Sequence, residues 1–364
     1  MSISLDISEL AFGGRNVVVS GDFAQLPPSS KGYPLYSHSI GSVIHRANSV
    51  QLQRSTMGKA LWHTFTTVVL LTQNMRQTGS SPEDLYFRQI LMDLRYCACT
   101  DEQIAWMNSR AAGRGPGQAR MSDPNVKYSS IITAWNASRD KINEMGVPAF
   151  ANDIEGVLET FYSRQKKKST IDVLRSSDVV DQTMQDHLWK VHPARTEHHP
   201  GKLILCIGMP VLIKYNEATE AGVTNGAEGF VVGWNAHPIS EEKQTLDTLF
   251  VRLKLTASTV KVKGLPDNVV PVSAYTKSIG VKLSDDTVVR VSRTQIPVVL
   301  NFAMTDYGSQ GRSRPSNPFD PGECKSHQSL YTCLSRGTSW KSTVLVRPIP
   351  DNVGKGILSE QLRR

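Results

Sequence analysis

The stretch Phe12-Gly-Gly-Arg-Asn-Val-Val-Val-Ser-Gly-Asp-Phe-Ala-Gln-Leu-Pro-Pro28 decides the expected fold. Three consecutive β-branched residues, Val17 to Val19, predict a short strand that is buried on both faces. A Gly-Asp pair ends this strand, and the Pro-Pro pair prevents further pairing. Because ligands of an open parallel sheet bind beyond the carboxyl ends of its strands, Asp22 and Gln25 are expected at the rim of a crevice. A strand followed by a solvated turn is the alternative.

A second apolar run, Val68 to Leu71, predicts another buried strand. It leads into the polar segment Gln73-Asn-Met-Arg-Gln77, so Arg76 is expected at the same rim of the sheet. Tyr128 to Trp135 predicts a third strand, and Thr343 to Val346 predicts the last one. Together these strands indicate an α/β protein with a nucleotide-binding type of sheet.

Local capping signals predict where helices start. Ser81-Pro-Glu-Asp84 combines a capping serine, a proline at the first helical position and two acids at the positive end of the helix dipole. Thr100-Asp-Glu-Gln103 is a capping box, and its helix is expected to stop near Gly113. Two further helices are expected, one from Asn136 to Gly146 and one from Gln328 to Arg336.

From Lys202 onward the chain is rich in short apolar runs bounded by turn residues. The expected strands are Leu203–Ile207, Pro210–Lys214, Gly229–Trp234 and Leu249–Leu255, and Thr224-Asn-Gly226 marks a tight turn. Strands at this spacing predict a small β-barrel. Residues 151 to 200 have no clear pattern, so we expect an insertion of low order there.

Composition limits the possible partners. The chain has 364 residues and a mass of 40.2 kDa, enough for two or three domains. A net charge of +8 and a pI near 9.2 fit a polyanionic partner, although a solvated basic surface explains them too. Five cysteines without zinc-site spacing predict reduced thiols, an intracellular compartment and no metal site. No run reaches the roughly 18 apolar residues of a membrane span.

Several stretches occur in the order found in one enzyme family. Gly21-Asp-Phe-Ala-Gln-Leu-Pro-Pro28 is similar to the third motif, G-D-x-x-Q-L-P, of the PIF-type, RecD-like DNA helicases of superfamily one. The likeness continues at Gln73–Gln77, at Asn301-Phe-Ala-Met-Thr-Asp-Tyr-Gly-Ser-Gln-Gly311 and at Tyr331-Thr-Cys-Leu-Ser-Arg336. Gly58–His63 and Cys206–Ile213 most resemble the helicase regions of fungal Helitron-type transposons.

This resemblance implies ATP hydrolysis coupled to translocation on DNA and its unwinding, with ATP and Mg²⁺ as cofactors. The implied fold is α/β, a RecA-like P-loop NTPase motor with an inserted small β-barrel. Residues 1–115 would be the C-terminal part of the first RecA-like domain with a helical linker. Residues 116–200 and 290–350 would form the second RecA-like domain with its poorly ordered insertion, and residues 201–289 the barrel.

The matched motifs assign candidate site residues. Gln25 corresponds to the family's sensor of the terminal phosphate, and Arg76 and Arg336 to its two arginines, with a structural salt bridge as the alternative for each. These three are the catalytic candidates. Including them, the nucleotide-binding candidates are Gly21, Asp22, Gln25, Arg76, Gly311 and Arg336.

The loop from Thr305 to Gly311 resembles the family's DNA-binding loop with one departure. Tyr307-Gly308 replaces the family's His-Lys pair, which removes a cation, and Tyr307 is expected to stack on a base instead. The DNA-binding candidates are Thr305, Tyr307, Ser309 and Gln310.

The phosphate-binding loop itself is absent. No G-x-x-x-x-G-K-[ST] occurs in the sequence, and the family's Asp-Glu motif is also missing before Gly21. We therefore expect an N-terminally truncated helicase that is inactive alone, so whether the chain is an enzyme stays open. The alternatives are a non-catalytic relic that binds single-stranded DNA and an α/β interaction module.

The resemblance also implies the cellular setting. Single-stranded or forked DNA is the implied partner, without a membrane. A nuclear location follows, with the mitochondrion as the alternative. DNA repair, recombination and telomere maintenance are the processes that the family serves.

Overall fold

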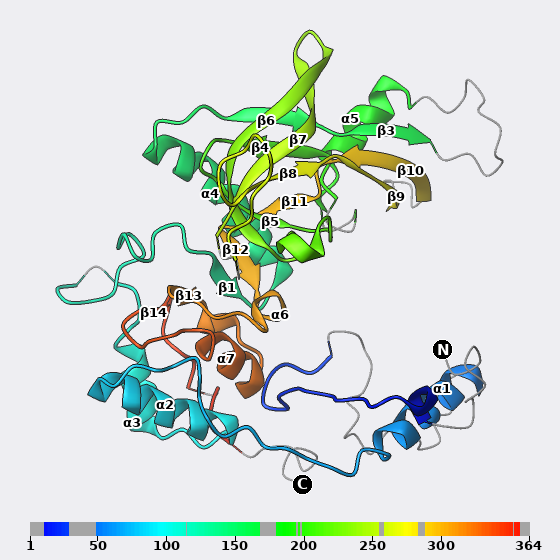
Figure 1. The fold of residues 1–364 in the computed structure, drawn as a ribbon. Coiled ribbons are helices and arrows are strands. Elements are labelled where there is room, and N and C mark those ends of the chain that lie inside the picture. The colour runs from blue at the N-terminus through cyan, green and yellow to red at the C-terminus, as the bar shows by residue number, and fades with distance from the viewer. Residues whose placement is uncertain are drawn as a thin grey trace. The chain divides into compact units, whose positions relative to one another are not determined.

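The computed structural model describes residues 11–28, 49–113, 115–167, 180–193, 196, 199–254, 258–282, 288–351 and 353–356. The chain forms two compact units, which Figure 1 shows coloured along the chain. Unit 1 combines Met1–Lys127 with Ser309–Arg364, and unit 2 is the continuous segment Tyr128–Gly308. Among the described residues, no helix is both long and apolar enough to cross a membrane.

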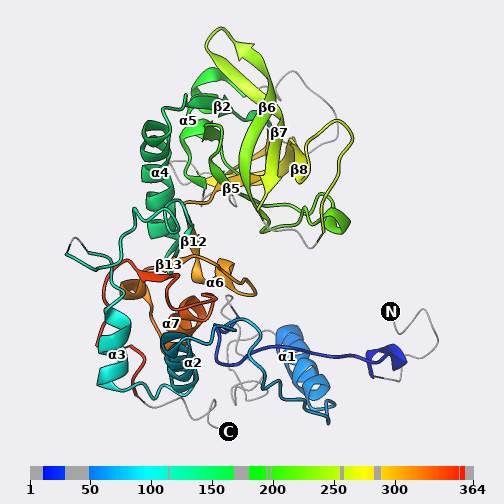
Figure 2. The same cartoon turned by 60° about the vertical axis from the view of Figure 1, so that its left-hand side comes forward.

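Unit 1 is mainly helical. Its helical elements are η2 (Ala11–Gly14), α1 (Ser49–Trp62), α2 (Pro82–Arg95), α3 (Asp101–Asn108), η6 (Pro321–Glu323) and α7 (His327–Leu334). Its strands β13 (Asn317–Phe319) and β14 (Thr343–Leu345) pair in parallel. Helices α2 and α7 lie side by side in both Figure 1 and Figure 2, although they are far apart in the sequence. This pair carries the polar residues of the site described below.

The predicted helix starts in unit 1 are confirmed. The Ser81 hydroxyl accepts a hydrogen bond from the Asp84 backbone N–H at 3.1 Å, and Thr100 forms a complete capping box with Gln103. Helix α3 ends at Asn108, earlier than expected, because the chain then turns to β14. There the backbone N–H of Ala112 donates to the carbonyl of Leu345 at 2.7 Å.

An aromatic stack joins distant parts of unit 1. The indole rings of Trp106 and Trp340 lie 4.1 Å apart with an interplanar angle of 17°, which is a stacked arrangement. Phe87 lies against Trp340 at 5.3 Å, and Tyr86 meets Trp106 edge-on at 4.8 Å. The stack therefore ties α2 and α3 to the segment that precedes β14.

Unit 2 is rich in strands. Its helical elements are α4 (Asn136–Asp153), α5 (Gln182–Lys190), η5 (Thr219–Ala221) and, at its end, α6 (Asp306–Ser309). Its strands are β1 (Ile131–Thr133), β2 (Glu159–Tyr162), β3 (Arg164–Lys167), β4 (Lys202–Leu205), β5 (Pro210–Ile213), β6 (Glu228–Ser240), β7 (Lys243–Leu253), β8 (Val269–Ser273), β9 (Tyr275–Lys282), β10 (Val288–Gln295), β11 (Val298–Leu300) and β12 (Ala303–Thr305).

The strands of unit 2 form separate groups. A seven-stranded sheet has the order β11-β5-β6-β7-β2-β4, with β8 paired to β7, and β3-β10-β9 is a three-stranded sheet. Strands β1 and β12 pair in parallel, and α4 packs on both. The closed small barrel expected from the sequence stays a prediction, because the seven-stranded sheet runs between two edge strands among the described residues.

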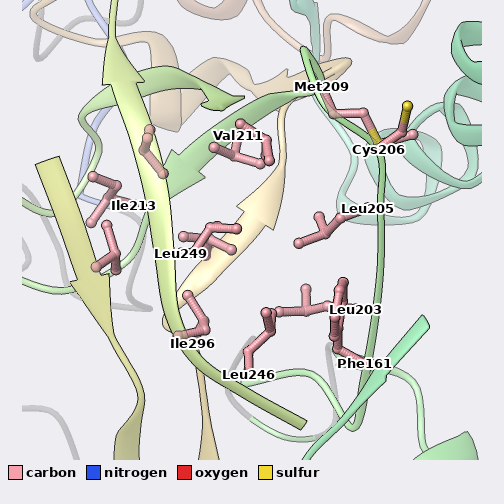
Figure 3. Packing of buried hydrophobic residues seen from close by; sticks show 14 of the residues in the cluster. Phe161, Leu203, Leu205, Cys206, Met209, Val211, Ile213, Leu246, Leu249 and Ile296 are labelled. Carbon is pink, nitrogen blue, oxygen red and sulfur yellow. The ribbon is translucent and has the colours of Figure 1, made fainter. Parts of the chain in front are cut away.

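The larger hydrophobic cluster of unit 2 has all its buried members between Val147 and Phe302. A smaller cluster joins Leu188 to Ile279, Val281 and Val291. Figure 3 shows Leu205, Leu249 and Ile296 lying between strands of the sheets, and each is fully buried. The expected strands from Leu203 onward are confirmed in position, and β6 and β7 are longer than predicted. The Thr224-Asn-Gly226 turn is closed by a hydrogen bond from Ala227 N–H to the Thr224 carbonyl at 2.9 Å.

Two predictions for unit 2 are wrong. The helix from Asn136 does not end at Gly146 but continues to Asp153. Gly146 lies inside it because the ring of Phe302 occupies the space that a Cβ would need. The segment 151–200 is not an insertion of low order throughout, because β2 pairs with β4 and β7 in the main sheet. Residues 168–179 of that segment lie outside the described residues.

The two strands predicted in unit 1 are also wrong as buried strands. Val17–Val19 and Val68–Leu71 belong to no strand, and their side chains are 40 to 93% exposed. The sequence predicted burial from aliphatic character alone, but burial needs neighbouring strands, and no described strand pairs with either segment.

Candidate functional site

A tight turn follows the first of these segments in unit 1. The Gln25 backbone N–H donates to the Asp22 carbonyl at 3.1 Å, and the Ala24 N–H donates to Asp22 Oδ1 at 3.0 Å. The Gln25 side-chain amide donates to Asp22 Oδ2 at 3.2 Å. Asp22 therefore organises its own turn, as aspartates commonly do, and it fixes the side chain of Gln25.

Two residues from other elements hold the Asp22 carboxylate. Arg95, at the end of α2, donates from Nη1 to Asp22 Oδ2 at 2.8 Å and to the Tyr331 hydroxyl at 2.7 Å. Tyr331, on α7, donates to the same carboxylate at 3.4 Å. Burial disfavours the charged form of Asp22, but the hydrogen bonds from Arg95 and Gln25 outweigh it and lower the pKa of Asp22 below 3.8.

Helix α7 anchors the turn with one face. The Gln328 amide donates to the carbonyls of Phe23 and Gln25, both at 3.0 Å. The Leu26 backbone N–H donates to Thr332 Oγ1 at 3.3 Å. Tyr331 and Thr332 follow Gln328 by three and four residues, which places both on the same face of the helix as Gln328. This helix therefore positions the whole turn.

Arg76 reaches the same helix from the second exposed segment. Its Nη1 donates to the Ser335 carbonyl at 2.9 Å, and its Nε donates to Ser313 Oγ at 3.0 Å. The neighbouring Gln77 donates to the carbonyls of Ser335 and Gly337 at 3.1 and 2.5 Å. Burial lowers the pKa of Arg76, while Tyr331 and Asp22 oppose that shift, so both groups lie close to it.

Arg336 is buried just beyond the end of α7, with 1% of its surface exposed. Its Nε donates to the Thr332 carbonyl at 2.9 Å, and its Nη2 donates to Ser335 Oγ at 2.7 Å. Its Nη1 has no hydrogen-bond partner among the described residues. Burial, followed by the charge of Arg76, lowers the pKa of Arg336 to about 10. A buried cation with a free donor is the observation that most needs a ligand.

We call Asp22, Gln25, Arg76 and Arg336 the polar cluster. These four residues come from three motifs that lie far apart in the sequence, and the structure brings them together within unit 1. Arginines are suited to phosphate because their planar fork donates several hydrogen bonds to its oxygens. The two arginines of the cluster are therefore chemically suited to a phosphate group.

The cluster offers donors for a phosphate group, whereas the described residues offer no site for the metal ion of MgATP. Within the described ranges, no group of three His, Cys, Asp or Glu side chains could hold a metal ion. The Asp22 carboxylate is already engaged by Arg95. A bound ATP would supply the reactive phosphoanhydride, and binding of its last phosphate by this cluster stays a prediction.

The two candidate glycines differ. Gly311 has a φ of +76°, a conformation that side chains rarely adopt, so its backbone needs glycine. A Cβ at Gly21 would meet no atom within 4 Å, so nothing in its surroundings requires glycine there. A nucleotide-binding role stays a prediction for both.

The candidate DNA contacts have different environments. In unit 2, Tyr307 is 38% exposed, and Thr305 accepts a hydrogen bond from the Gly308 backbone N–H at 3.1 Å. In unit 1, Ser309 is fully buried, and the Gln310 amide donates to the Leu26 carbonyl at 3.3 Å. Gln310 therefore links the loop to the turn that holds Gln25. DNA binding by these four residues stays a prediction.

Sequence reasoning missed Arg95, Tyr331 and Gln328. Tyr331 lies in a matched motif, and Gln328 lies three residues before it on the predicted helix. Their spacing could have indicated that both lie on one face of that helix. Arg95 had no such signal, because it lies 73 residues from Asp22 and 236 from Tyr331. Only the fold brings these three together.

Comparison with known proteins places this geometry in context. No protein-family model matches the chain. It is 23% identical over 374 residues to uncharacterized protein 030L of Invertebrate iridescent virus 6, covering 93% of this chain and 66% of that protein. It is 25% identical over 334 residues to the ATP-dependent DNA helicase PIF1 of Mus musculus, covering 90% of this chain and 39% of that one.

Solved structures agree with these relatives. The Pif1 helicase from Candida albicans superposes with a TM-score of 0.58 at 18% identity, covering 97% of this chain and 68% of that chain. The chain is similar to PIF1 helicases in sequence and in fold. Bacteroides Pif1 in complex with ADP-AlF3 and single-stranded DNA gives a TM-score of 0.56 at 20% identity, covering 96% and 65% of the two chains.

The PIF1 likeness establishes the motor fold for this chain. The chain spans 39% of the length of mouse PIF1. The closer resemblance to Helitron-type helicases, the truncation and the domain boundaries stay predictions.

Proposed function

We propose that the chain is the part of a PIF-type DNA helicase that senses the terminal phosphate of ATP and transmits its presence to bound DNA. The observation that carries this proposal is the polar cluster, in which Arg336 is buried beside Arg76 and Asp22 and its Nη1 has no partner among the described residues. Gln25 and the two arginines keep the roles that the sequence motifs assign to them. Mouse PIF1 is an ATP-dependent DNA helicase by name, and the Bacteroides structure holds a nucleotide analogue and DNA.

We further propose single-stranded DNA as the partner. The net charge of +8 favours a polyanion. The hydrogen bond from Gln310 to Leu26 connects the candidate DNA-binding loop to the turn that holds Gln25, so it could couple DNA binding to nucleotide binding. The proposed location is the nucleus or the mitochondrion. Hydrolysis by this chain alone is not proposed, because the sequence contains no G-x-x-x-x-G-K-[ST] loop.

The first experiment measures binding of fluorescent single-stranded DNA by the chain at several salt concentrations. Phosphate contacts release counterions, so the logarithm of the association constant should fall linearly with the logarithm of salt concentration, with a slope of about −0.7 per contact. Tyr307→Ala should weaken binding by about 1–3 kcal/mol if the ring stacks on a base. Binding without a salt slope would support the interaction module instead.

The second experiment tests the cluster in a complete motor, made by joining a PIF1 phosphate-loop segment to this chain. Arg336→Ala should lower the rate of ATP hydrolysis by about a thousandfold while leaving single-strand affinity nearly unchanged. Lys341→Ala, at an exposed position, is the matched control. Equal loss of hydrolysis and affinity would contradict the assigned role.

A non-catalytic relic that binds single-stranded DNA is the second candidate, favoured by the absence of the phosphate loop from the sequence. It predicts normal salt-dependent binding of DNA by the chain. It also predicts that the joined motor fails to hydrolyse ATP even with Arg336 intact. The two experiments together therefore separate the candidates.

A further inference from the structure

Strand β4 lies at one edge of the seven-stranded sheet in unit 2. Among the described strands it pairs with β2 alone, and the Ser163 backbone N–H continues this ladder with a hydrogen bond to the Gly201 carbonyl at 2.9 Å. Because bonded pairs alternate along an antiparallel ladder, Leu203 and Leu205 direct their backbone groups toward β2. The backbone groups of the alternate residues of β4 therefore point to the open side of the sheet.

These alternate residues, Lys202 and Ile204, are both exposed. No described residue forms a hydrogen bond with their backbone groups. Their side chains point away from the core, since Figure 3 shows Leu203 and Leu205 on the inner side of the strand among the core residues. The edge therefore presents unpaired donors and acceptors beside an outward cation and an outward aliphatic side chain, an arrangement that can accept another strand.

Exposed aliphatic side chains gather at one end of this edge. They are 39 to 77% exposed, and we call them the edge patch: Ile154, Val157, Leu158, Ile204 and Ile207. The end of β4 lies beside the start of β2, because Glu159 pairs with Leu205. A Cβ at Gly156 would meet both Cys206 Sγ and Ile154 Cδ1, so the end of α4 reaches the same place. Single exposed aliphatic residues are ordinary, but a group of them at one sheet edge marks an interaction surface.

Two ammonium groups lie at the other end of the edge. Lys202 Nζ is 5.4 Å from the centre of the Tyr162 ring, and Lys243 Nζ is 5.9 Å from the same ring. Lys243 Nζ is also 5.4 Å from the centre of the Trp189 ring. The aromatic faces attract both cations, but no described carboxylate pairs with either of them. Two like charges at one ring therefore favour the arrival of an anionic side chain.

We propose that the open edge of β4 binds an extended peptide segment of a partner protein, which adds to the sheet as a further strand. The segment carries an acidic side chain beside Lys202 and an aliphatic side chain two positions away, beside Ile204. In such binding the backbone hydrogen bonds give affinity, and the alternate side chains give specificity. The site lies within unit 2 and does not depend on the polar cluster of unit 1.

The chemistry of the edge selects a peptide over other occupants. Single-stranded DNA offers phosphates to the lysines, but it has no backbone that can pair with a strand. A second copy of the chain would bring two pairs of lysines to one short edge, where like charges oppose pairing. Lysine alone protects an edge from unwanted pairing, but here the edge patch leaves apolar surface uncovered beside it.

The test uses the full chain and a fluorescent octapeptide in which threonine alternates with two isoleucines and then two glutamates. Fluorescence anisotropy should show saturable binding, and a peptide with lysine in place of both glutamates should bind about tenfold more weakly. The double variant Lys202→Glu, Lys243→Glu should prefer the lysine peptide instead. The matched control is Lys261→Glu, Lys263→Glu, which changes the net charge equally at exposed positions and should keep the preference for glutamate.

Hydrogen exchange resolved by residue distinguishes strand addition from binding elsewhere. The amides of Lys202 and Ile204 should exchange more slowly when the glutamate peptide is bound. Those of Leu203 and Leu205, which already face β2, should change little. Ile204→Thr keeps a β-branched residue in the strand, so it should weaken binding while the circular dichroism spectrum stays unchanged.

Equal affinity for the two peptides, or no saturable binding of the glutamate peptide, would overturn the proposal. Binding that leaves the amides of Lys202 and Ile204 unprotected would overturn it as well. Protection of these amides by an oligothymidine strand would make nucleic acid the occupant. Their protection in a dimer of the chain alone would make a second copy the occupant.

Discussion

Asp22 has the environment of a carboxylate that must stay ionised. It is half-buried, and Arg95, Gln25 and Tyr331 all donate to it. A charge in such a place is tolerated only when it is paired, and removing one partner leaves the other with an uncompensated cost. The stability of this part of unit 1 should therefore depend on the charge of one side chain.

Asp22→Asn should destabilise unit 1 by about 1–3 kcal/mol at pH 7, because it replaces a charge-assisted bond to Arg95. The folded pKa of Asp22 lies below its ordinary value of 3.8. The stabilisation is thus present above about pH 3.8 and is lost as the pH falls through the folded pKa. Urea unfolding of the chain and of Asp22→Asn should be compared at pH 7 and at about pH 2.5. The difference between their free energies of unfolding should be smaller at the lower pH.

Glu102→Gln is the control for this substitution, since Glu102 is an exposed carboxylate in the first turn of α3. It should change stability by less than about 0.5 kcal/mol. If both substitutions changed the free energy of unfolding equally at both pH values, the charge of Asp22 would have no special role in stability.

At this scale the sequence predicted some residues and not others. Gln25, Arg76 and Arg336 could be named as candidates because each stands in a motif with its own local pattern, and their roles stay predictions. Arg95 was missed because its contact with Asp22 forms only in the folded chain. An arginine in the last turn of a helix is also common, since its charge interacts favourably with the helix dipole. The residue type alone does not indicate which distant residue it will contact.

Among the elements, α7 has only eight residues but contacts most of the polar cluster. One face holds the turn of Gln25, its carboxyl end receives Arg76 and Gln77, and Arg336 follows directly. The helix is itself buried along most of its length, so it is a rigid reference for these groups. Movement of the helix would move all of them.

Gln328→Ala should loosen the turn without unfolding α7. It removes two hydrogen bonds, to the carbonyls of Phe23 and Gln25. At about 1 kcal/mol for each, amide exchange in residues 22–26 should rise by roughly tenfold or more, while the amides of α7 stay protected. Lys341→Ala serves as the control, and unchanged exchange in the turn would show that Thr332 and Tyr331 hold it alone.

A second element-scale feature lies in unit 2, where Arg293 of β10 is buried. It donates to the carbonyls of His199 at 2.8 Å and Leu188 at 2.7 Å, which fixes α5 and the segment at His199 to the small sheet. Burial, then the charge of Arg293, lowers the pKa of His199 to about 4. His199 is therefore neutral in the folded protein.

The stability of unit 2 should fall as the pH decreases from 6.5 toward 4. In that window the unfolded chain binds a proton at His199 that the folded unit excludes, so unfolding gains on the order of 3 kcal/mol at most. Thermal unfolding of the chain and of His199→Gln should show a steeper pH dependence for the chain. His237, a half-exposed histidine, provides the control substitution His237→Gln.

Element types were predictable where the signal is local. The caps at Ser81 and Thr100 were found because a cap and its partner lie three residues apart. The end of α4 was not, because Gly146 continues the helix under the ring of Phe302, more than a hundred positions away. The exposure of Val17–Val19 and Val68–Leu71 was also not predictable locally, because it follows from the lack of a paired strand among the described residues.

On the scale of the whole molecule, the two units differ in continuity. Unit 2 is one uninterrupted segment with its hydrophobic core contained between Val147 and Phe302. Unit 1 joins both ends of the chain through α2, α7 and β14. A segment with its own core can fold alone, whereas a unit built from two separated segments needs both.

Residues 128–308 expressed alone should therefore fold cooperatively. Circular dichroism should show strand content and a sigmoidal thermal transition, and the transition should keep the pH dependence assigned to His199. Residues 1–127 expressed alone should show no cooperative transition, because they lack α7 and the segment that packs on α2. A cooperative transition in that segment would show that unit 1 does not depend on the end of the chain.

The stacked indoles of Trp106 and Trp340 give the protein an optical reporter of its own. Two such chromophores at 4.1 Å couple their electronic transitions and produce an exciton couplet in circular dichroism. One ring comes from the first third of the chain and the other from its last tenth, so the couplet exists only while the two ends are joined. The time course of its loss would therefore report when the two ends of the chain separate during unfolding, without any added dye.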